Sequence, residues 1–259
     1  MNCSNAASFF LLTILAASEP ALAQTPAEAT PAPPSVVSVF TDLGRDLRHL
    51  ASRDSLLILG AAGAASLAVT HEDAAITHDA SHSHPLETAL DQGALIGAGA
   101  SQVGAAVAVY GLGRAFHNTD AAFLGADLLQ AQIVNGLLTQ TLKYAVNRTR
   151  PDGGRYSFPS GHSSATFATA TVLERHFGWR IGAPAYALAG YVAASRLSEN
   201  RHFTSDVIFG AGIGIVSGRA MTIRRANAAL TVTPFPLHGG GGVSVTLGPS
   251  RFDPRPLDE

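Results

Sequence analysis

Three short segments in the second half of this 259-residue chain place charged and hydrogen-bonding residues beside long apolar runs. The first runs from Lys143 to Pro151 (KYAVNRTRP), the second from Phe158 to His162 (FPSGH), and the third from Ser195 to Asp206 (SRLSENRHFTSD). Together they supply cations, two histidines, a carboxylate and a Pro-Ser-Gly turn. A fold that brings these segments together has the side chains needed for chemistry on a dianionic phosphoryl group.

The cations and the turn suit the binding of a phosphate. Lys143, Arg150 and Arg196 can neutralise its oxygens, arginine through a planar fork and lysine as a compact point charge. Ser160 and Gly161 come just before a predicted helix, where backbone N–H groups point toward an anion. Because Gly161 has no side chain, a phosphate can approach the backbone closely there.

The two histidines are predicted to divide the chemistry. His202 and Asp206 are four residues apart, so on a helix they would share one face. A carboxylate on one imidazole nitrogen fixes the tautomer and makes the other nitrogen a better nucleophile. His162 has no such carboxylate nearby in sequence and suits a general acid for the leaving oxygen.

Each segment alone is more often structural: a basic helix end, a turn with a helix cap, or a solvated His/Asp pair. In order, however, the segments match the pattern Lys-x6-Arg-Pro, Pro-Ser-Gly-His and Ser-Arg-x5-His-x3-Asp without a departure. This pattern resembles that of the type 2 phosphatidic acid phosphatase and vanadium haloperoxidase superfamily. The resemblance implies a helical bundle, a phosphohistidine on His202 oriented by Asp206, and His162 as the acid. It also implies the phosphate ligands Lys143, Arg150, Ser160, Gly161 and Arg196.

We therefore predict a metal-independent phosphatase, without a cofactor, that acts on a phosphomonoester or on a lipid phosphate or diphosphate. Two alternatives stay open. One is a vanadate-dependent haloperoxidase, since the same constellation can hold vanadate, and the other is a non-catalytic phosphate or lipid binder. The formal net charge of −2 lacks the positive excess that is typical of nucleic-acid-binding proteins. The expected partners are a phosphorylated small molecule or lipid and a membrane, either as a surface or as a surrounding bilayer.

The N-terminus is typical of an exported chain. Residues 9–17 form an apolar stretch, and Ala21-Leu-Ala23 offers small residues for cleavage before Gln24. We predict a signal peptide over residues 1–23 and a Pro/Ala-rich linker over 24–35, with a short uncleaved anchor as the alternative. The single cysteine, Cys3, excludes a disulfide within one chain. These features predict an exported protein of the periplasm or cell envelope.

The rest of the chain predicts an all-α fold: a helical bundle of about six core helices over residues 36–225, with a short C-terminal β-hairpin and tail over 226–259. Apolar residues recur at helical spacing from Val36 to Leu50. Alternation in residues 230–233 and 243–247, around four glycines, predicts the hairpin. The expected helices are 56–70, 93–113, 121–144, 163–176, 181–197 and 203–219.

A polar connection is expected over residues 71–92. It carries His71, His78, His82 and His84 together with acidic residues. These side chains are of the kinds that bind metals, but such a cluster is more often a solvated loop, and the predicted chemistry needs no metal.

Whether the bundle spans a membrane is the remaining question. Residues 93–113 have the length of a span but are rich in Gly and Ala, and Asp127 inside a span would cost roughly 2.5–3.5 kcal/mol. If the signal exports the chain, six spans starting at Leu56 would put the three segments on the cytoplasmic side. These points favour an exported domain resting on a membrane surface, with an integral inner-membrane bundle as the alternative.

Overall fold

The computed structural model describes residues 33–83, 90, 92–222, 228–237 and 240–249. The predicted signal peptide, most of the predicted linker, Cys3, His84 and the end of the tail lie outside these residues. The chain divides into two compact units, one over residues 31–226 and the other combining residues 1–30 with 227–259. The described parts of each unit are treated by themselves below.

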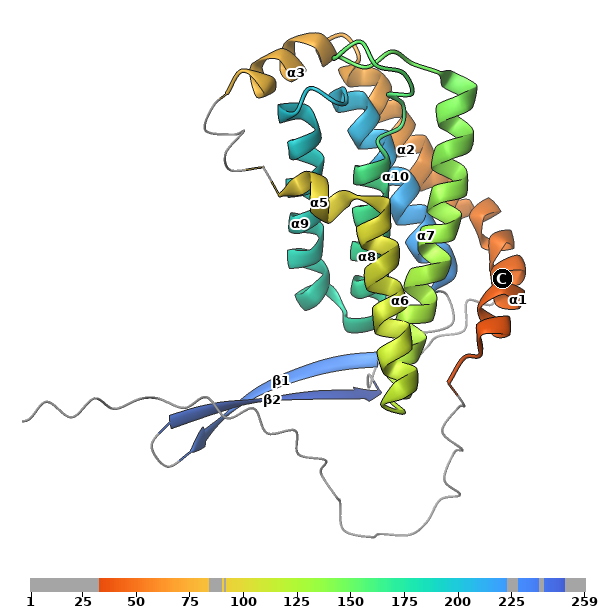
Figure 1. The fold of residues 1–259 in the computed structure, drawn as a ribbon, viewed down its shortest axis with the longest axis vertical. Helices are drawn as coiled ribbons and strands as arrows, with labels where there is room; N and C mark the ends of the chain where they lie inside the picture. The colour runs from red at the N-terminus through yellow and green to blue at the C-terminus, as the bar shows by residue number, and fades with distance from the viewer. Residues whose placement is uncertain (1–32, 84–89, 91, 223–227, 238–239, 250–259) are drawn as a thin grey trace, which may run out of the picture. The chain divides into compact units, whose positions relative to one another are not determined.

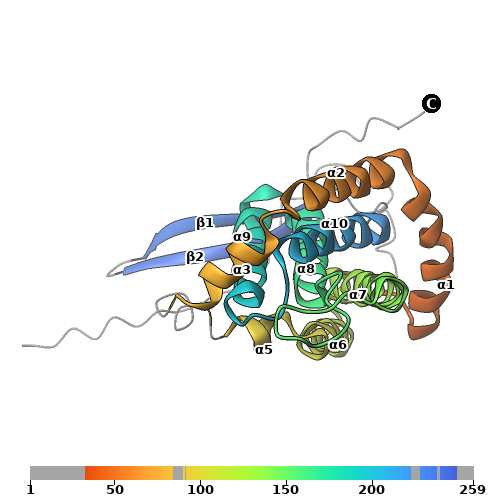
Figure 2. The same cartoon turned by 90° about the horizontal axis from the view of Figure 1, so that it is seen from above.

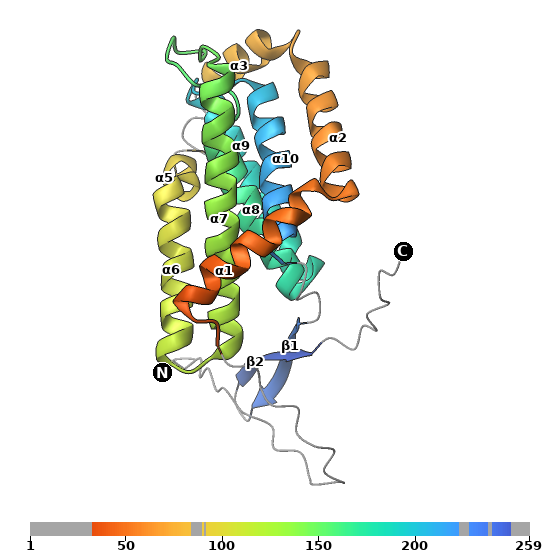
Figure 3. The same ribbon diagram turned by 90° about the vertical axis from the view of Figure 1, so that its right-hand side faces the viewer.

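The first unit is helical, which confirms the all-α prediction. Helices α8 and α10 run side by side at its centre, with α2 and α7 packed against α10 and α9 against α8 (Figures 1 and 2). Helix α6 covers α7, and α1 crosses α7 obliquely (Figure 3). A 3-10 turn, Leu47–Ala51, joins α1 to α2. The helices are α1 Val36–Asp46, α2 Arg53–Val69, α3 Asp73–Ser81, α5 Gly93–Gly97, α6 Gly99–Ala115, α7 Thr119–Val146, α8 Gly161–Phe177, α9 Trp179–Ser198 and α10 Thr204–Met221.

Two stretches differ from the sequence prediction. The predicted polar connection contains the helix α3, whose first residue, Asp73, is buried. The predicted helix over residues 93–113 breaks at Ala98, which has an extended backbone (ψ 133°) and separates α5 from α6. The break lets α5 lie close to α9 and α8, where a side chain at Gly93 would overlap Ser195 and one at Gly97 would come within 3.0 Å of His162.

Small residues on α10 allow the central pair of helices to approach closely. Gly210, Gly214 and Gly218 recur every four residues and face α8. A Cβ atom on Gly210 would lie 2.6 Å from the carbonyl oxygen of Ser160, and one on Gly218 would lie 2.8 Å from that of Ala168. Because glycine spares this space, the helix backbones come into contact.

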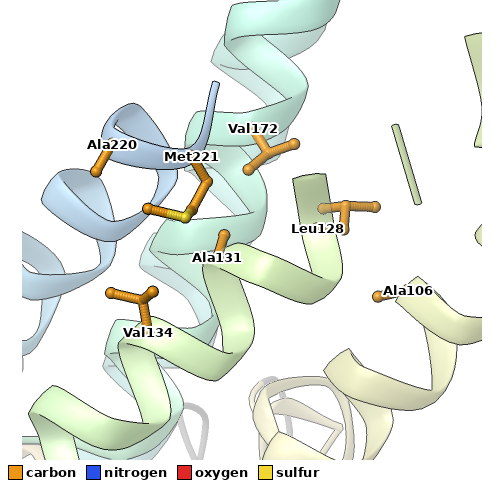
Figure 4. Packing of buried hydrophobic residues seen from close by; sticks show 7 residues of the cluster. All are labelled: Ala106, Leu128, Ala131, Val134, Val172, Ala220 and Met221. Atoms are coloured by element: carbon orange, nitrogen blue, oxygen red, sulfur yellow. The ribbon is translucent and has the colours of Figure 1, made fainter. Parts of the chain in front are cut away.

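The apolar core is modest in size and built from side chains of four helices. Figure 4 shows its buried cluster, in which α6, α7, α8 and α10 meet. Most of its members are small or β-branched, so the helices are held by close contact rather than by large interlocking side chains. The cluster comprises Ala106, Leu128, Ala131, Val134, Val172, Ala220 and Met221.

In the second unit, strands β1 (Ala228–Leu237) and β2 (Gly240–Pro249) pair antiparallel. Ala228 lies opposite Pro249, and Leu237 lies opposite Gly240. The connection at residues 238–239 lies outside the described residues, so the C-terminal hairpin stays a prediction.

The glycine contacts give a stability test. Gly214→Ala would place a methyl group onto the backbone of α8, so we expect a loss of about 1–3 kcal/mol in unfolding free energy. Gly104→Ala is the matched control, since a Cβ there meets nothing within 4 Å and alanine favours helix by up to about 1 kcal/mol. Thermal unfolding of both variants checks this, and an unchanged Tm for Gly214→Ala would contradict the close packing.

Candidate active site

The three sequence segments meet at one end of the bundle, on the loops that join α7 to α8 and α9 to α10. A pocket of about 340 Å³ lies there. Its lining includes Lys143, Arg150, Gly161, His162 and His202. Of the other predicted residues, Ser160, Arg196 and Asp206 are buried around the pocket rather than on its wall.

His202 does not share a helix with Asp206, so the shared helix face considered from their spacing does not apply, although the predicted helix start at residue 203 is close to the observed one. It lies in the loop before α10, which begins at Thr204, and Asp206 is in the first turn of that helix. The Asp206 carboxylate accepts the backbone N–H of Phe203 at 2.9 Å. This contact caps the N-terminus of α10, so the helix does not extend back to His202. The two side chains still face each other, with His202 Nδ1 3.6 Å from Asp206 Oδ2.

Both members of this pair are almost fully buried, at 3% exposure for His202 and 0% for Asp206. The Nδ1–Oδ2 separation is slightly longer than a hydrogen bond, and within the described residues Nδ1 has no hydrogen-bond partner. A small shift of the ring would bring Nδ1 into contact with the carboxylate. The opposite edge of the ring is then the one available to the pocket.

Two residues that the sequence analysis missed hold the Asp206 carboxylate. Ser157 Oγ donates to Asp206 Oδ2 at 2.5 Å, and Arg148 Nη1 donates to Asp206 Oδ1 at 2.7 Å. Both lie within or beside the first two segments. The sequence gives no spacing rule that links either of them to a carboxylate about 50 residues later.

The pocket cations are held by main-chain oxygens of the α7–α8 loop. Lys143 Nζ donates to the carbonyl of Tyr156 at 2.7 Å, and Arg150 Nε donates to the carbonyl of Arg155 at 2.9 Å. Both positive groups therefore have a fixed place on the pocket wall.

Arg196 differs from these two cations. It is buried and forms an ion pair with Glu199, and its Nε donates to Ser195 Oγ at 3.2 Å. Its charge still acts on the pocket, because it is one of the charges that lower the pKa of His162.

The start of α8 presents the expected anion-binding geometry. Ser160 is the cap residue, with its Oγ accepting the N–H of Ser163 at 3.4 Å, and Gly161 is the first helical residue. A Cβ on Gly161 would meet Lys143 and Thr139 only at 3.8 Å, so the protein itself has room for a side chain there. The glycine instead leaves the space in front of the helix N-terminus open to a ligand.

Burial and positive charge shift the titration of both histidines. Burial is the largest effect and lowers the pKa of His202, Asp206 offsets part of this, and Lys143 and Arg150 lower the pKa further. Burial, together with the charges of Arg196, His202 and Lys143, lowers the pKa of His162 to about 4. At neutral pH both rings are therefore neutral, and a bound dianion would raise the pKa of His162.

The described part of the His71–His84 segment does not gather into a metal site. His78 and His82 stack with ring centroids 4.1 Å apart, and His78 lies 3.5 Å from the exposed Asp79. Among the described residues, no three His, Cys, Asp or Glu side chains come together in a way that could hold a metal ion.

A family model described as the PAP2 superfamily matches residues 124–229, the stretch that contains every residue named above for the pocket. Over this stretch the helical unit is similar to the PAP2 superfamily.

Among curated proteins, the chain is similar to a lipid A 1-phosphatase of Porphyromonas gingivalis, with 41% identity over 101 residues. That match covers 37% of this chain and 22% of the relative. A PA-phosphatase related-family protein of Dictyostelium discoideum is 30% identical over 131 residues, covering 39% of this chain and 48% of the relative. The chain thus spans less than half the length of either relative.

Among solved structures, the fold is similar to a transmembrane PAP2-type phosphatidylglycerolphosphate phosphatase of Bacillus subtilis. The TM-score is 0.51 at 22% identity, and the match covers 71% of this chain and 92% of that one. LpxE of Aquifex aeolicus gives a TM-score of 0.46 at 24% identity, over 54% of this chain and 87% of that one.

The shifted histidines can be titrated directly. In the free protein we expect both imidazole rings to protonate below the usual pKa of 6.5, with His162 near a pKa of about 4. Ring resonances followed by NMR across pH 3–8, assigned with His162→Gln and His202→Gln, measure this. Addition of vanadate should move the His162 titration upward, whereas a free-protein pKa of 6.5 or more would contradict the cationic pocket.

Proposed function

We propose that this protein is a phosphatase of lipid phosphates or diphosphates that works through a phosphohistidine on His202. The observation that carries the proposal is the shared pocket: a buried neutral histidine backed by a carboxylate faces the same space as a second histidine and two fixed cations. This arrangement has a nucleophile, an acid and charge stabilisation for one phosphoryl group.

In the proposed reaction, His202 Nε2 attacks phosphorus while Asp206 stabilises the proton on Nδ1. The bond between phosphorus and the leaving oxygen breaks, and protonated His162 gives its proton to that oxygen. Water then attacks the phosphohistidine, His162 takes a proton from the water, and phosphate leaves with His202 restored. Lys143, Arg150 and the α8 N-terminus stabilise charge in both steps, which supports a mechanism without a divalent metal.

An apolar groove beside the pocket supports a lipid as the substrate. The groove, of about 490 Å³, opens along α7 over Ile133, Leu137 and Tyr144, and it shares Gly136 and Gln140 with the pocket. Leu137 and Tyr144 are 61% and 68% exposed. A molecule with its phosphate in the pocket can lay an apolar chain along this groove, as the name of the relative from Porphyromonas gingivalis suggests for that protein.

The exposed faces of the helices support a bilayer around the bundle. Lys, Arg, Asp and Glu are missing from residues 55–69, 99–113, 181–195 and 207–218, although many side chains in the first three of these stretches are exposed. In α2 the buried residues are Ser55 and Ser66, while Leu57 and Leu67 face outward. Polar residues inside and apolar residues outside is the arrangement that lipid requires. Neither His162 nor His202 falls within the four uncharged stretches.

Helix length and the environment of Asp127 also bear on whether the bundle spans a membrane. By length and composition, one described helix, Thr119–Val146, qualifies alone as a span, and the bent pair Val36–Ala51 with Arg53–Val69 qualifies together. The cost expected for Asp127 in lipid is reduced because its carboxylate is buried and lies 2.8 Å from His176 Nε2. These contacts favour the integral alternative over a domain resting on a membrane surface.

The phosphohistidine gives the first functional test. His202→Ala should lower kcat by roughly 10⁴- to 10⁶-fold, because the nucleophile is lost, and acid-labile radiolabel trapped from a phosphorylated substrate should disappear. The substrates are lipid A, phosphatidic acid, phosphatidylglycerol phosphate, undecaprenyl diphosphate and a soluble aryl phosphate. His78→Ala, which changes an exposed histidine of α3, is the control and should keep wild-type activity.

The same assay separates the alternatives. Phosphate release should survive excess chelator and be inhibited by vanadate, whose five-coordinate adduct resembles the transition state. Full activity of His202→Ala would refute the nucleophile. Bromide oxidation by peroxide with added vanadate, and no phosphate release, would favour the haloperoxidase alternative, and binding without turnover of any substrate would favour the binder.

Membrane embedding gives a second test. The protein should stay with membranes in high salt and carbonate and require detergent for release. Leu188→Lys, near the middle of α9 where the side chain is 48% exposed, should reduce the amount of inserted protein, since a central lysine costs about 2.5–3.5 kcal/mol. Leu188→Met is the matched control. Release without detergent and normal yield of Leu188→Lys would instead indicate a surface-bound domain.

A further inference from the structure

A guanidinium outside the three-segment pattern connects the catalytic carboxylate to a distant helix. Arg148 follows the end of α7, and its Nη1 donates to Asp206 Oδ1 and to Ser205 Oγ, both at 2.7 Å. Its Nη2 donates to Asp73 Oδ2 at 2.9 Å. One arginine thus joins the start of α3 to the first turn of α10.

Asp73 is placed to hold both Arg148 and α10. It is the first residue of α3 and only 2% exposed. Besides Arg148, its carboxylate accepts the backbone N–H of Ser205 at 2.9 Å and the Ser205 hydroxyl. A buried carboxylate with these partners is stable only as long as the cation stays, because removal of Arg148 would leave a buried charge without its ion pair.

The Arg148 guanidinium stacks on an aromatic ring through its face, in addition to the ion pairs along its edge. Its central carbon lies 4.3 Å from the ring centroid of Phe203, the residue between His202 and α10. Such stacking adds to the two ion pairs and limits the rotation of the side chain. The Asp206 oxygens are then fixed on one side by Arg148 and on the other by Ser157 and the Phe203 N–H.

We propose that Arg148 and Asp73 are positioning residues for phosphoryl transfer: they set the orientation of Asp206 and, through it, of His202. The proposal rests on the function proposed above. It gives α3 a role in the reaction although no atom of α3 lines the pocket. The part of the chain expected to be a solvated connection supplies the outer end of a relay that runs from Asp73 through Arg148 and Asp206 to His202.

A positioning role differs from a structural one in its kinetics. Arg148→Ala should lower kcat by about 10- to 100-fold, as loss of an orienting partner commonly does, with KM within about threefold of wild type because phosphate ligands are untouched. Added guanidinium should recover part of the lost kcat. Arg148→Lys should be intermediate, since an ammonium keeps the charge but lacks the fork that reaches both carboxylates.

Matched variants complete the experiment. Arg180→Ala removes an exposed arginine at the start of α9, outside the pocket lining, and should keep wild-type kcat. Asp73→Asn keeps the size of Asp73 and should lower kcat in the same direction as Arg148→Ala. Size-exclusion profiles and Tm are measured for each, so that loss of folded protein is corrected for. An unchanged kcat in Arg148→Ala, a loss explained by unfolding, or a KM effect alone would overturn the proposal.

Failure of the proposed function is distinguishable from failure of this inference. If the wild-type protein releases no phosphate from any substrate, the phosphatase is refuted. Orthovanadate binding by calorimetry then still tests the relay, because vanadate binds the histidine without turnover. Arg148→Ala should weaken this binding about tenfold, since the ring it bonds to is no longer oriented, and equal affinities for wild type and Arg148→Ala would overturn the inference.

Discussion

The close contact of α8 with α10 is the constraint on which the site depends. Three glycines of α10 remove the side chains that would separate the two helices. The same approach brings the backbone N–H of Ser160 to the carbonyl of Asp206 at 2.9 Å, which joins the second and third segments directly. The anion-binding end of α8 and the carboxylate behind His202 are therefore placed by backbone contact, which is less adaptable than side-chain packing.

Hydrogen bonds between α7 and α8 hold the helices together further inside the bundle. On the inner face of α7, Gln132 donates to the carbonyl of Ala165 and to Thr169 of α8, both at 2.9 Å, and Thr139 pairs with Ser164 at 3.1 Å. In the proposed bilayer setting, hydrogen bonds and close helix contacts are the interactions left to hold the helices together. The pocket is thus the open end of an interior that is polar for much of its length.

Much of the bundle and the gathering of the segments could be predicted from sequence, because apolar runs set the helices and the segments fall at their ends. The α3 helix could not, since it is short and polar and is anchored by Asp73 through contacts with Ser205, more than 130 residues away. The start of α10 was predicted closely, at residue 203 against the observed Thr204. The sequence did not show how that start is held: the Asp206 carboxylate accepts the Phe203 N–H, which leaves His202 in the loop before the helix. Arg148 was hidden because a bridge between two distant carboxylates leaves no periodic signal.

The way the two pocket cations are held has a consequence for how this protein can diversify. Lys143 and Arg150 are fixed by carbonyl oxygens of Tyr156 and Arg155, and carbonyls are present whatever the side chain. Residues 152–155, which follow Arg150 in the same loop, are exposed. The Arg155 side chain can therefore be exchanged while Lys143 and Arg150 keep their carbonyl contacts, whereas Gly153, at φ 86°, favours glycine. Variation of an exposed side chain and constancy of the pocket charge are thus separable properties of this loop.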